Sequence, residues 1–223
     1  MKRSKSTAGK CGFCGKDFDK SAMAGHLTAC EKRNDLTKRD SAKKIKTYLI
    51  MAEGRYSPEY WIFIEADSAA KLKHLDDFLR KIWLECCGHL SAFEINRMRY
   101  NVISDEELQG KTMNISLDKV LKAGSVFYHE YDFGSTTYLS LKVIYEQPGV
   151  SIGKKIKLLA RNNPPESLCA VCGQPAEQIC TECFWSDKEA LFCNKCAESH
   201  QCDSGMFLPV VNSPRVGVCG YTG

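Results

Sequence analysis

Residues 126–145 read VFYHEYDFGSTTYLSLKVIY, a stretch in which apolar and polar side chains alternate on both sides of a Gly-Ser break. Alternation with a period of two is typical of strands that bury one face, and Gly134-Ser135 supplies the turn between them. The stretch therefore predicts a hairpin of two strands, Val126 to Phe133 and Tyr138 to Tyr145. We expect Phe133 to be packed and Gly134 to take a positive φ.

Similar β-rich runs on both sides of this hairpin predict further strands at residues 45–52, 60–66, 91–100 and 152–160. A helix is expected to be capped by Asp67-Ser68 and to run through Trp83 or beyond. A shorter one is expected from Ser116 to Leu121. Apolar residues at three- and four-residue steps give the longer helix one buried face. Consecutive strands favour an α+β fold, with an antiparallel sheet and helices on one face.

Composition divides the chain into four units joined by polar segments. They are a disordered basic leader at 1–9, a CCHC zinc finger at 10–33, the α+β domain at 44–162, and a Cys/His-rich zinc module with a C-terminal tail at 166–223. Residues 34–43 form a charged linker, and the run from Asn162 to Pro165 breaks the chain before the last unit.

Charge is concentrated near the N-terminus. Residues 1–50 contain thirteen Lys and Arg against five Asp and Glu, a net charge of +8, whereas the whole chain has +4. Such a basic region is typical of a phosphate-binding footprint, and a solvated tail explains it equally well. The chain shows neither a signal peptide nor a membrane-spanning apolar run, which favours a cytoplasmic protein.

The chain contains 13 cysteines, most of them in C-x2-C pairs with histidines at ligand spacing. In a reducing compartment this pattern indicates metal sites rather than disulfides. Near the N-terminus the expected ligands are Cys11, Cys14, His26 and Cys30. The first two lie on a tight knuckle, and the last two are four residues apart on one helical face. We expect one closed, structural zinc site.

Eight more ligands occur within 34 residues near the C-terminus, enough for two further zinc ions and three in all. They are Cys169, Cys172, Cys180, Cys183, Cys193, Cys196, His200 and Cys202. Only one residue separates His200 from Cys202, which is a short spacing for two ligands of the same metal. Either the chain is extended there, or Cys219 or Asp187 replaces one ligand.

The spacing of these pairs resembles the treble-clef modules of the MYND, HIT finger and B-box type. In those modules the first and third pairs share one metal, and the second and fourth share another. The resemblance implies one group of Cys169, Cys172, Cys193 and Cys196, and a second of Cys180, Cys183, His200 and Cys202. Modules of this kind generally bind proteins.

Residues 128–135 and 138–143, with the strand 60–65 and the helix 72–83, also resemble the Ri-plasmid ORF-three-like domain. The resemblance covers about residues 44 to 147. It implies an α+β domain that occurs in prokaryotes, often on plasmids or mobile elements, and it supplies no catalytic residue. The segment from Pro209 to Tyr221 is similar to the tail of longer, zinc-bearing members.

Two smaller features of the sequence also resemble functional motifs. Asp132-Phe133-Gly134 occurs without the other kinase motifs, so it is interpreted as a strand end and turn. Cys86, Cys87 and His89 cluster at a helix end. A redox site or a fourth metal site would use such residues, but a buried helix terminus is the preferred interpretation.

Three functional classes stay open. The first is a nucleic-acid-associated zinc protein that binds DNA or RNA through the basic N-terminal region. The second is a protein-interaction adaptor that docks through the C-terminal module. An accessory enzyme of recombination or a nuclease is disfavoured, since the expected carboxylate or arginine constellation is missing from the sequence. We therefore predict a non-enzymatic protein with no catalytic residues and no membrane partner.

Overall fold

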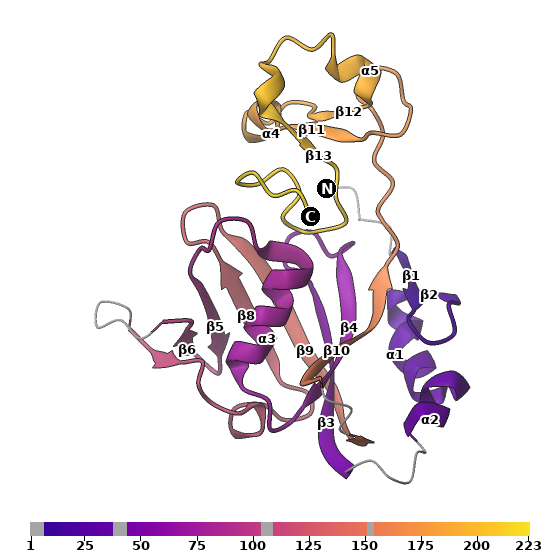
Figure 1. Cartoon of the computed structure of the whole chain (residues 1–223), viewed down its shortest axis with the longest axis vertical. Helices are drawn as coiled ribbons and strands as arrows, with labels where there is room; N and C mark the ends of the chain where they lie inside the picture. Colours follow the sequence, from indigo (N-terminus) through magenta and orange to yellow (C-terminus); the bar gives the residue numbers. More distant parts are fainter. Residues whose placement is uncertain (1–6, 38–43, 104–108, 151–153) are drawn as a thin grey trace.

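The computed structural model describes residues 7–37, 44–103, 109–150 and 154–223. Two thirds of the basic leader and most of the charged linker expected from the sequence lie outside these residues. Within them the chain forms one large sheet with few helices, and a small module stands at one end of that sheet (Figure 1).

Ten strands make up the large sheet, in the order β2-β1-β10-β4-β3-β9-β8-β5-β6-β7. Neighbouring strands are antiparallel except β6 and β7, which are parallel. The strands are β1 (Ala8–Cys11), β2 (Asp17–Asp19), β3 (Lys44–Gly54), β4 (Trp61–Asp67), β5 (Ser91–Ile95), β6 (Met98–Asn101), β7 (Lys111–Thr112), β8 (Val126–Tyr131), β9 (Thr137–Val150) and β10 (Ile156–Asn162). The mixed α+β class with an antiparallel sheet is therefore as expected.

Both faces of this sheet are covered, because its central strands are buried on both sides. Helix α3 (Leu72–Leu79) packs with Ile50 and Ile62 on one face. Helix α1 (Lys20–Ala29) packs with Leu49 and Phe63 on the other. Successive residues of a strand point to opposite faces, so each of these strands contributes to both cores. The helices of the α+β domain itself therefore pack on one face, and the helix of the finger covers the other face, which the sequence did not predict.

The finger is part of the sheet and does not stand apart from it. Strand β1 pairs with β10, with Gly9 opposite Asn162 and Cys11 opposite Ala160. Strand β2 continues the sheet beyond β1, and the short helix α2 (Glu31–Thr37) follows α1. Residues 8 and 9, expected in a disordered leader, are thus paired strand residues. The boundary expected between finger and α+β domain is bridged by main-chain hydrogen bonds.

The long helix begins later than the sequence pattern indicated. Asp67 Oδ1 accepts a hydrogen bond from the backbone N–H of Ala69, 2.9 Å away, so Asp67 holds a turn before the helix instead of capping it. Helix α3 starts at Leu72, and a π-helical turn, η1 (Arg80–Leu84), extends it past Trp83. The expected helix at Ser116 is one 3-10 turn, η2 (Leu117–Lys119).

Two expected strands differ from those observed. The single strand predicted over 91–100 is a tight hairpin, because Asn96 and Arg97 adopt φ values of 52° and 63° and turn the chain between β5 and β6. The last strand of the sheet, β10, begins at Ile156 rather than at residue 152, and residues 151–153 lie outside the described part.

The Asp-Phe-Gly turn between β8 and β9 is built around Asp132. This residue, and not Gly134, takes the positive φ, at 67°. Its Oδ1 accepts hydrogen bonds from the backbone N–H groups of Gly134 and Ser135 at 3.1 and 3.3 Å. The Phe133 side chain is partly exposed beside Arg99 and is not packed in the core.

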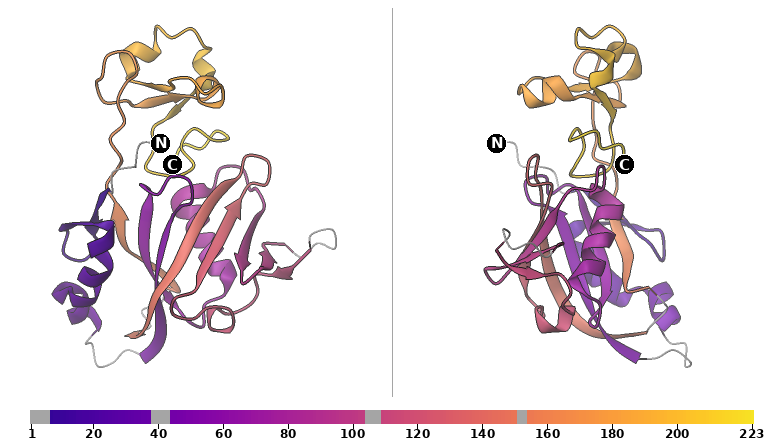
Figure 2. Two further views of the ribbon diagram at one scale, coloured as in Figure 1. Left: turned by 180° about the vertical axis from the view of Figure 1, so that it is seen from behind. Right: turned by 60° about the vertical axis from the view of Figure 1, so that its left-hand side comes forward.

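The C-terminal module is a three-stranded sheet with two short helices and one 3-10 turn. Its elements are β11 (Gln178–Cys180), α4 (Thr181–Trp185), β12 (Leu191–Phe192), α5 (Asn194–Ala197), η3 (Ser204–Met206) and β13 (Phe207–Pro209). The tail after β13 lies between this module and the end of the large sheet, as both views in Figure 2 show. In the described part of the chain, no helix combines the length and apolarity that crossing a membrane requires.

Candidate metal centres

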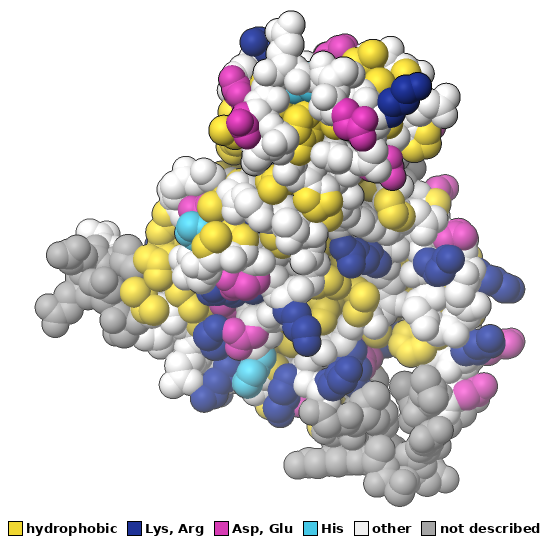
Figure 3. Space-filling view, turned by 45° about the horizontal axis from the view of Figure 1, so that its top comes forward, with side chains coloured by type: hydrophobic (Ala, Val, Ile, Leu, Met, Phe, Trp, Pro, Cys, Tyr) yellow, Lys and Arg dark blue, Asp and Glu magenta, His cyan; other side chains and the backbone are white. Residues whose placement is uncertain are grey.

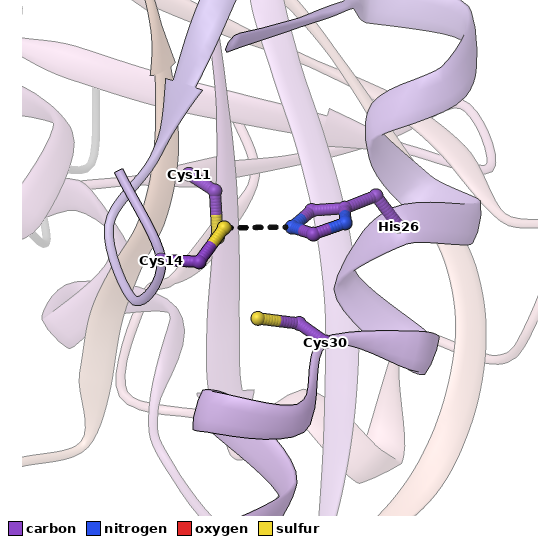
Figure 4. Close-up of side chains that lie close together, drawn as sticks. All are labelled: Cys11, Cys14, His26 and Cys30. Atoms are coloured by element: carbon purple, nitrogen blue, oxygen red, sulfur yellow. Dashed lines mark hydrogen bonds between the residues drawn. The ribbon is translucent and has the colours of Figure 1, made fainter. Parts of the chain in front are cut away.

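The N-terminal centre brings together the four ligands expected from the sequence. The donor atoms of Cys11, Cys14, His26 and Cys30 all lie within 4.8 Å of one another, and these side chains could hold a metal ion. Cys11 ends β1, Cys14 lies in the turn that follows, His26 belongs to α1, and Cys30 follows that helix (Figure 4). Cys14 Sγ is 3.3 Å from His26 Nε2, the contact drawn as a dashed line in the figure.

The turn that carries the first two cysteines is closed by the backbone. The N–H of Gly15 donates to the carbonyl of Cys11, and the N–H of Gly12 donates to the carbonyl of Leu159 on β10. Gly15 has a φ of 73°, a conformation that glycine adopts without steric cost. The knuckle is therefore positioned by the large sheet as well as by its own turn.

The electrostatic environment of this centre favours one thiolate in particular. The backbone N–H of Lys16 is the main cause that lowers the pKa of Cys14, whereas burial raises the pKa of Cys11. Burial, with the nearby charge of Lys16, lowers the pKa of His26. A neutral imidazole is the form that binds a metal.

The C-terminal module contains two further centres. One comprises Cys169, Cys172, Cys193 and Cys196, and the other comprises Cys180, Cys183, His200 and Cys202. This grouping is the one that the treble-clef resemblance implied. His200 and Cys202 lie together in the second centre, so neither Cys219 nor Asp187 takes a place there.

Distances within the two centres are similar. Cys172 Sγ lies 3.7 Å from Cys193 Sγ, and Cys183 Sγ lies 3.8 Å from Cys202 Sγ and 3.3 Å from His200 Nε2. In the first centre, a hydrogen bond from the backbone of Cys193 is the main cause that lowers the pKa of Cys169 to about 6. A hydrogen bond with the sulfur of Cys193, followed by burial, raises the pKa of Cys196 to about 12.

A fourth group was not predicted as a site. Cys86, Cys87, His89 and Cys219 also have donor atoms within 4.8 Å of one another. The sequence offered two signals for it: Cys86, Cys87 and His89 lie close together in the chain, and Cys86, Cys87 and Cys219 are the cysteines left after the three expected centres are filled. What it did not show is that the tail returns to the end of α3. All thirteen cysteines are free thiols.

The fold and these clusters define a mixed α+β protein with four Cys/His groups that could hold metal. No protein-family model matches the chain. No curated protein matches it either. A similar solved structure is that of a protein of unknown function, MM3350, from Methanosarcina mazei Go1. It is 14% identical, with a TM-score of 0.45 over 58% of this chain and 76% of that chain. This similarity is too weak to support an argument about fold or function.

Proposed function

We propose that the chain is a non-enzymatic zinc protein that binds another protein through its C-terminal module. The proposal has two parts, the identity of the metal and the type of partner. For the metal, zinc fits the donor sets best, since each centre offers three or four sulfur atoms completed where needed by one imidazole. Such sites are closed and structural.

The dimensions of the centres support zinc. With Zn–S bonds of about 2.3 Å, two sulfurs of a tetrahedral site are separated by about 3.8 Å, and a sulfur and a nitrogen by about 3.6 Å. The S···S distances of 3.7 and 3.8 Å are close to the first value. The N···S distances of 3.3 Å are slightly shorter than the second. One zinc in each of the three expected centres gives three structural ions.

For the partner, the main observation is the exposed side chain of Trp185. It is 61% exposed at the end of α4, where it makes an edge-to-face contact with Phe184, which is also partly exposed. Val171 and Met206 add exposed apolar surface to the same module. Exposed tryptophan on a rigid, closed scaffold is typical of a protein-binding surface.

The ββα order of the finger is typical of modules that place a helix in the DNA major groove, but the surface of α1 does not favour such contacts. Met23 and Leu27 are buried against the large sheet, so that face of α1 is unavailable. The exposed positions of α1 carry small, uncharged side chains: Ser21, Ala22, Gly25, Thr28 and Ala29. Side chains of this size and charge cannot make the bidentate base contacts that sequence reading requires.

Two basic side chains of the N-terminal region form ion pairs within the protein. Lys20 lies 2.6 Å from Glu53, and Arg33 is buried 2.9 Å from Glu65. On the face shown in Figure 3, Lys and Arg are interleaved with Asp and Glu rather than gathered in one patch. Nucleic-acid association through the basic N-terminal region is the second candidate function. Of the thirteen basic residues that favour it, six lie in 1–6 and 38–43, outside the described residues.

We also propose that residues 44–147 form a Ri-plasmid ORF-three-like domain of a prokaryotic, mobile-element-associated protein. The support is the Tyr128 to Val143 pattern, which in this chain forms β8, the Asp132 turn and the start of β9. The proposed function does not depend on this family assignment.

The experiment compares two variants of exposed aromatic residues in a pulldown from the native host. Trp185→Ser should abolish retention of the partner. Tyr56→Ser, which removes a side chain 77% exposed on the α+β domain, should leave it unchanged. In parallel, fluorescence anisotropy with a generic DNA duplex and with RNA should show no salt-sensitive binding. Tight binding that weakens steeply with salt, together with a pulldown insensitive to Trp185, would support the nucleic-acid function instead.

A further inference from the structure

The fourth Cys/His group consists of Cys86, Cys87 and His89, in the loop between η1 and β5, and Cys219 in the C-terminal tail. His89 Nε2 lies 3.2 Å from Cys219 Sγ, although the two residues are 130 positions apart in the chain. Three sulfur atoms and one imidazole are the same donor set as in the N-terminal centre. The group also meets the same distance condition as the other three.

The loop that supplies three of these side chains is held in place by its own contacts. Glu85 Oε1 accepts a hydrogen bond from the backbone N–H of Gly88 at 2.7 Å, and Gly88 has a φ of 73°. The backbone N–H of Cys86 donates to the hydroxyl of Tyr131 at 3.4 Å. These contacts, none of which involves the tail, hold the backbone of the loop that carries the three donors.

The tail is held independently, close to the same place. Ser213 Oγ donates to the carbonyl of Trp83 at 2.7 Å, and Arg215 Nη2 donates to Asp132 Oδ2 at 2.7 Å. Turn hydrogen bonds then lead the chain from Arg215 to Val218 and on to Tyr221. Cys219 has a φ of 50°, which is uncommon for a residue other than glycine, and its sulfur lies beside His89.

A buried ion pair lies beside this group of donors. The Arg215 guanidinium, which is fully buried, lies 3.5 Å from Cys86 Sγ. Its partner Asp132 has a carboxylate oxygen 2.7 Å from Arg215 Nη2 and 3.7 Å from His89 Nε2. Polar groups that contact the ligands of a metal help to orient them, and this pair contacts two of the four side chains.

We propose that Cys86, Cys87, His89 and Cys219 bind a fourth zinc ion, which fastens the C-terminal tail to the end of α3. This site goes beyond the three structural ions of the proposed function. It also gives every cysteine of the chain a role as a ligand, ten in the three expected centres and three here. Because the ion would join the tail to the α+β domain, it would also restrain the zinc module that precedes the tail.

This site should exchange its metal more readily than the others. Cys87 and Cys219 are exposed and the other two ligands are half-buried, whereas each of the remaining centres contains at least one buried cysteine. A chelator therefore reaches the fourth ion more directly. We expect it to be the first of the four that is removed.

The test is the zinc stoichiometry of the reduced, full-length protein by native mass spectrometry. We expect four zinc ions in the wild type. Cys87→Ser and Cys219→Ser should each lose one ion, because both side chains are exposed and their replacement leaves the cores intact. Cys172→Ser is the control, because Cys172 is an exposed residue of a different centre. If the two centres are independent, the double variant Cys172→Ser/Cys219→Ser should bind two zinc ions fewer than the wild type.

Other outcomes would overturn the proposal. Identical stoichiometry in the wild type, Cys87→Ser and Cys219→Ser would show that the fourth group binds no zinc. In protein purified without reductant, a denatured mass lower by two hydrogens that reductant restores in the wild type and not in Cys219→Ser would indicate a disulfide among these cysteines instead. If Cys219→Ser failed to fold, cobalt(II) titration of His89→Asn would decide, with the loss of one tetrahedral, thiolate-bound equivalent expected. Failure of the proposed three structural zinc ions would give a different result. The wild type would then bind fewer than four zinc ions, and Cys219→Ser would still bind one fewer than the wild type.

Discussion

Arg215 Nη2 lies 2.7 Å from Asp132 Oδ2, so the Asp-Phe-Gly turn forms a buried ion pair with the C-terminal tail. The two residues are 83 positions apart, and the Arg215 side chain is fully buried. Arg215 Nη1 also donates to Thr137 Oγ1 at 3.0 Å and to the carbonyl of Ser135 at 3.2 Å. Asp132 therefore organises the turn and anchors the tail at the same time, whereas the sequence predicted only the role in the turn.

Replacement of Arg215 by methionine should be strongly destabilising. The variant leaves the Asp132 carboxylate buried without its partner, and breaking one side of a buried pair costs about 3–5 kcal/mol. Urea unfolding of the zinc-loaded protein measures this loss. Lys81→Met removes an exposed cation from η1 and should change the free energy of unfolding by less than about 0.5 kcal/mol. Similar stabilities for the two variants would contradict the anchoring role of Arg215.

The buried pair of Asp76 and His129 should make stability depend on pH. Asp76 Oδ1 lies 2.8 Å from His129 Nε2, and both side chains are fully buried. Burial acts to raise the pKa of Asp76, but the hydrogen bond and charge of His129 oppose it, and the pKa is lowered below its ordinary value. The pair thus contributes stability above about pH 4, and that contribution is lost as the pH falls through the lowered pKa.

Asp76→Asn isolates this effect. At pH 7 we expect the variant to be less stable by about 1–3 kcal/mol, because His129 loses a charged partner. Between pH 7 and pH 3 the variant should then lose less stability than the wild type, since protonation of the Cys and His side chains of the candidate metal centres affects both proteins equally. Urea titrations across this range measure the difference, with Asp77→Asn, an exposed neighbour on α3, as the control. Parallel pH curves for Asp76→Asn and the wild type would exclude the proposed linkage.

Gly9 and Gly25 form a matched pair for testing the join between the finger and the sheet. A Cβ on Gly9 would collide with the Trp61 indole and the backbone carbonyl of Arg161. Gly9→Ala should therefore cost about 1–3 kcal/mol. Gly25 is exposed in α1 with no neighbouring atom within 4 Å of such a Cβ, so Gly25→Ala should stabilise by about 0.5–1 kcal/mol. Thermal unfolding of the two variants should shift in opposite directions, and a neutral Gly9→Ala would mean that β1 is not packed against β10 as described.

Loss of the N-terminal metal should disturb the large sheet, whereas loss of a C-terminal metal should not. Cys11 pairs with Ala160, and Cys30 packs in the same cluster as Trp61 and Leu159. Binding of a structural metal is coupled to local folding. Hydrogen exchange followed by mass spectrometry should therefore accelerate in β1 and β10 of Cys30→Ala. In Cys196→Ala the acceleration should be confined to residues 166–209, and equal effects on β10 would refute the distinction.

Local patterns predicted much of the secondary structure, and they failed where distant contacts decide. The alternation around Tyr128 and Tyr138 correctly predicted a hairpin, because a period of two is a property of the strand itself. The start of α3 was missed because Asp67, a good helix cap in isolation, is used to bond Ala69 in the turn that follows β4. The hairpin between Ile95 and Met98 was missed because Asn96 and Arg97 occupy the left-handed region without the glycine that usually signals it.

By itself the sequence determined the chemistry of this protein, namely which cysteines and histidines are spaced to share a metal within one knuckle or one helical turn. Such spacing acts over three or four residues, so it is visible without a fold. Only the tertiary structure decided that β1 joins the finger to the central sheet and that helices cover both sheet faces. It also decided that Cys219 returns to Cys86, Cys87 and His89 across 130 residues. These relationships depend on strand order and on the buried Arg215–Asp132 pair, and no local pattern encodes them.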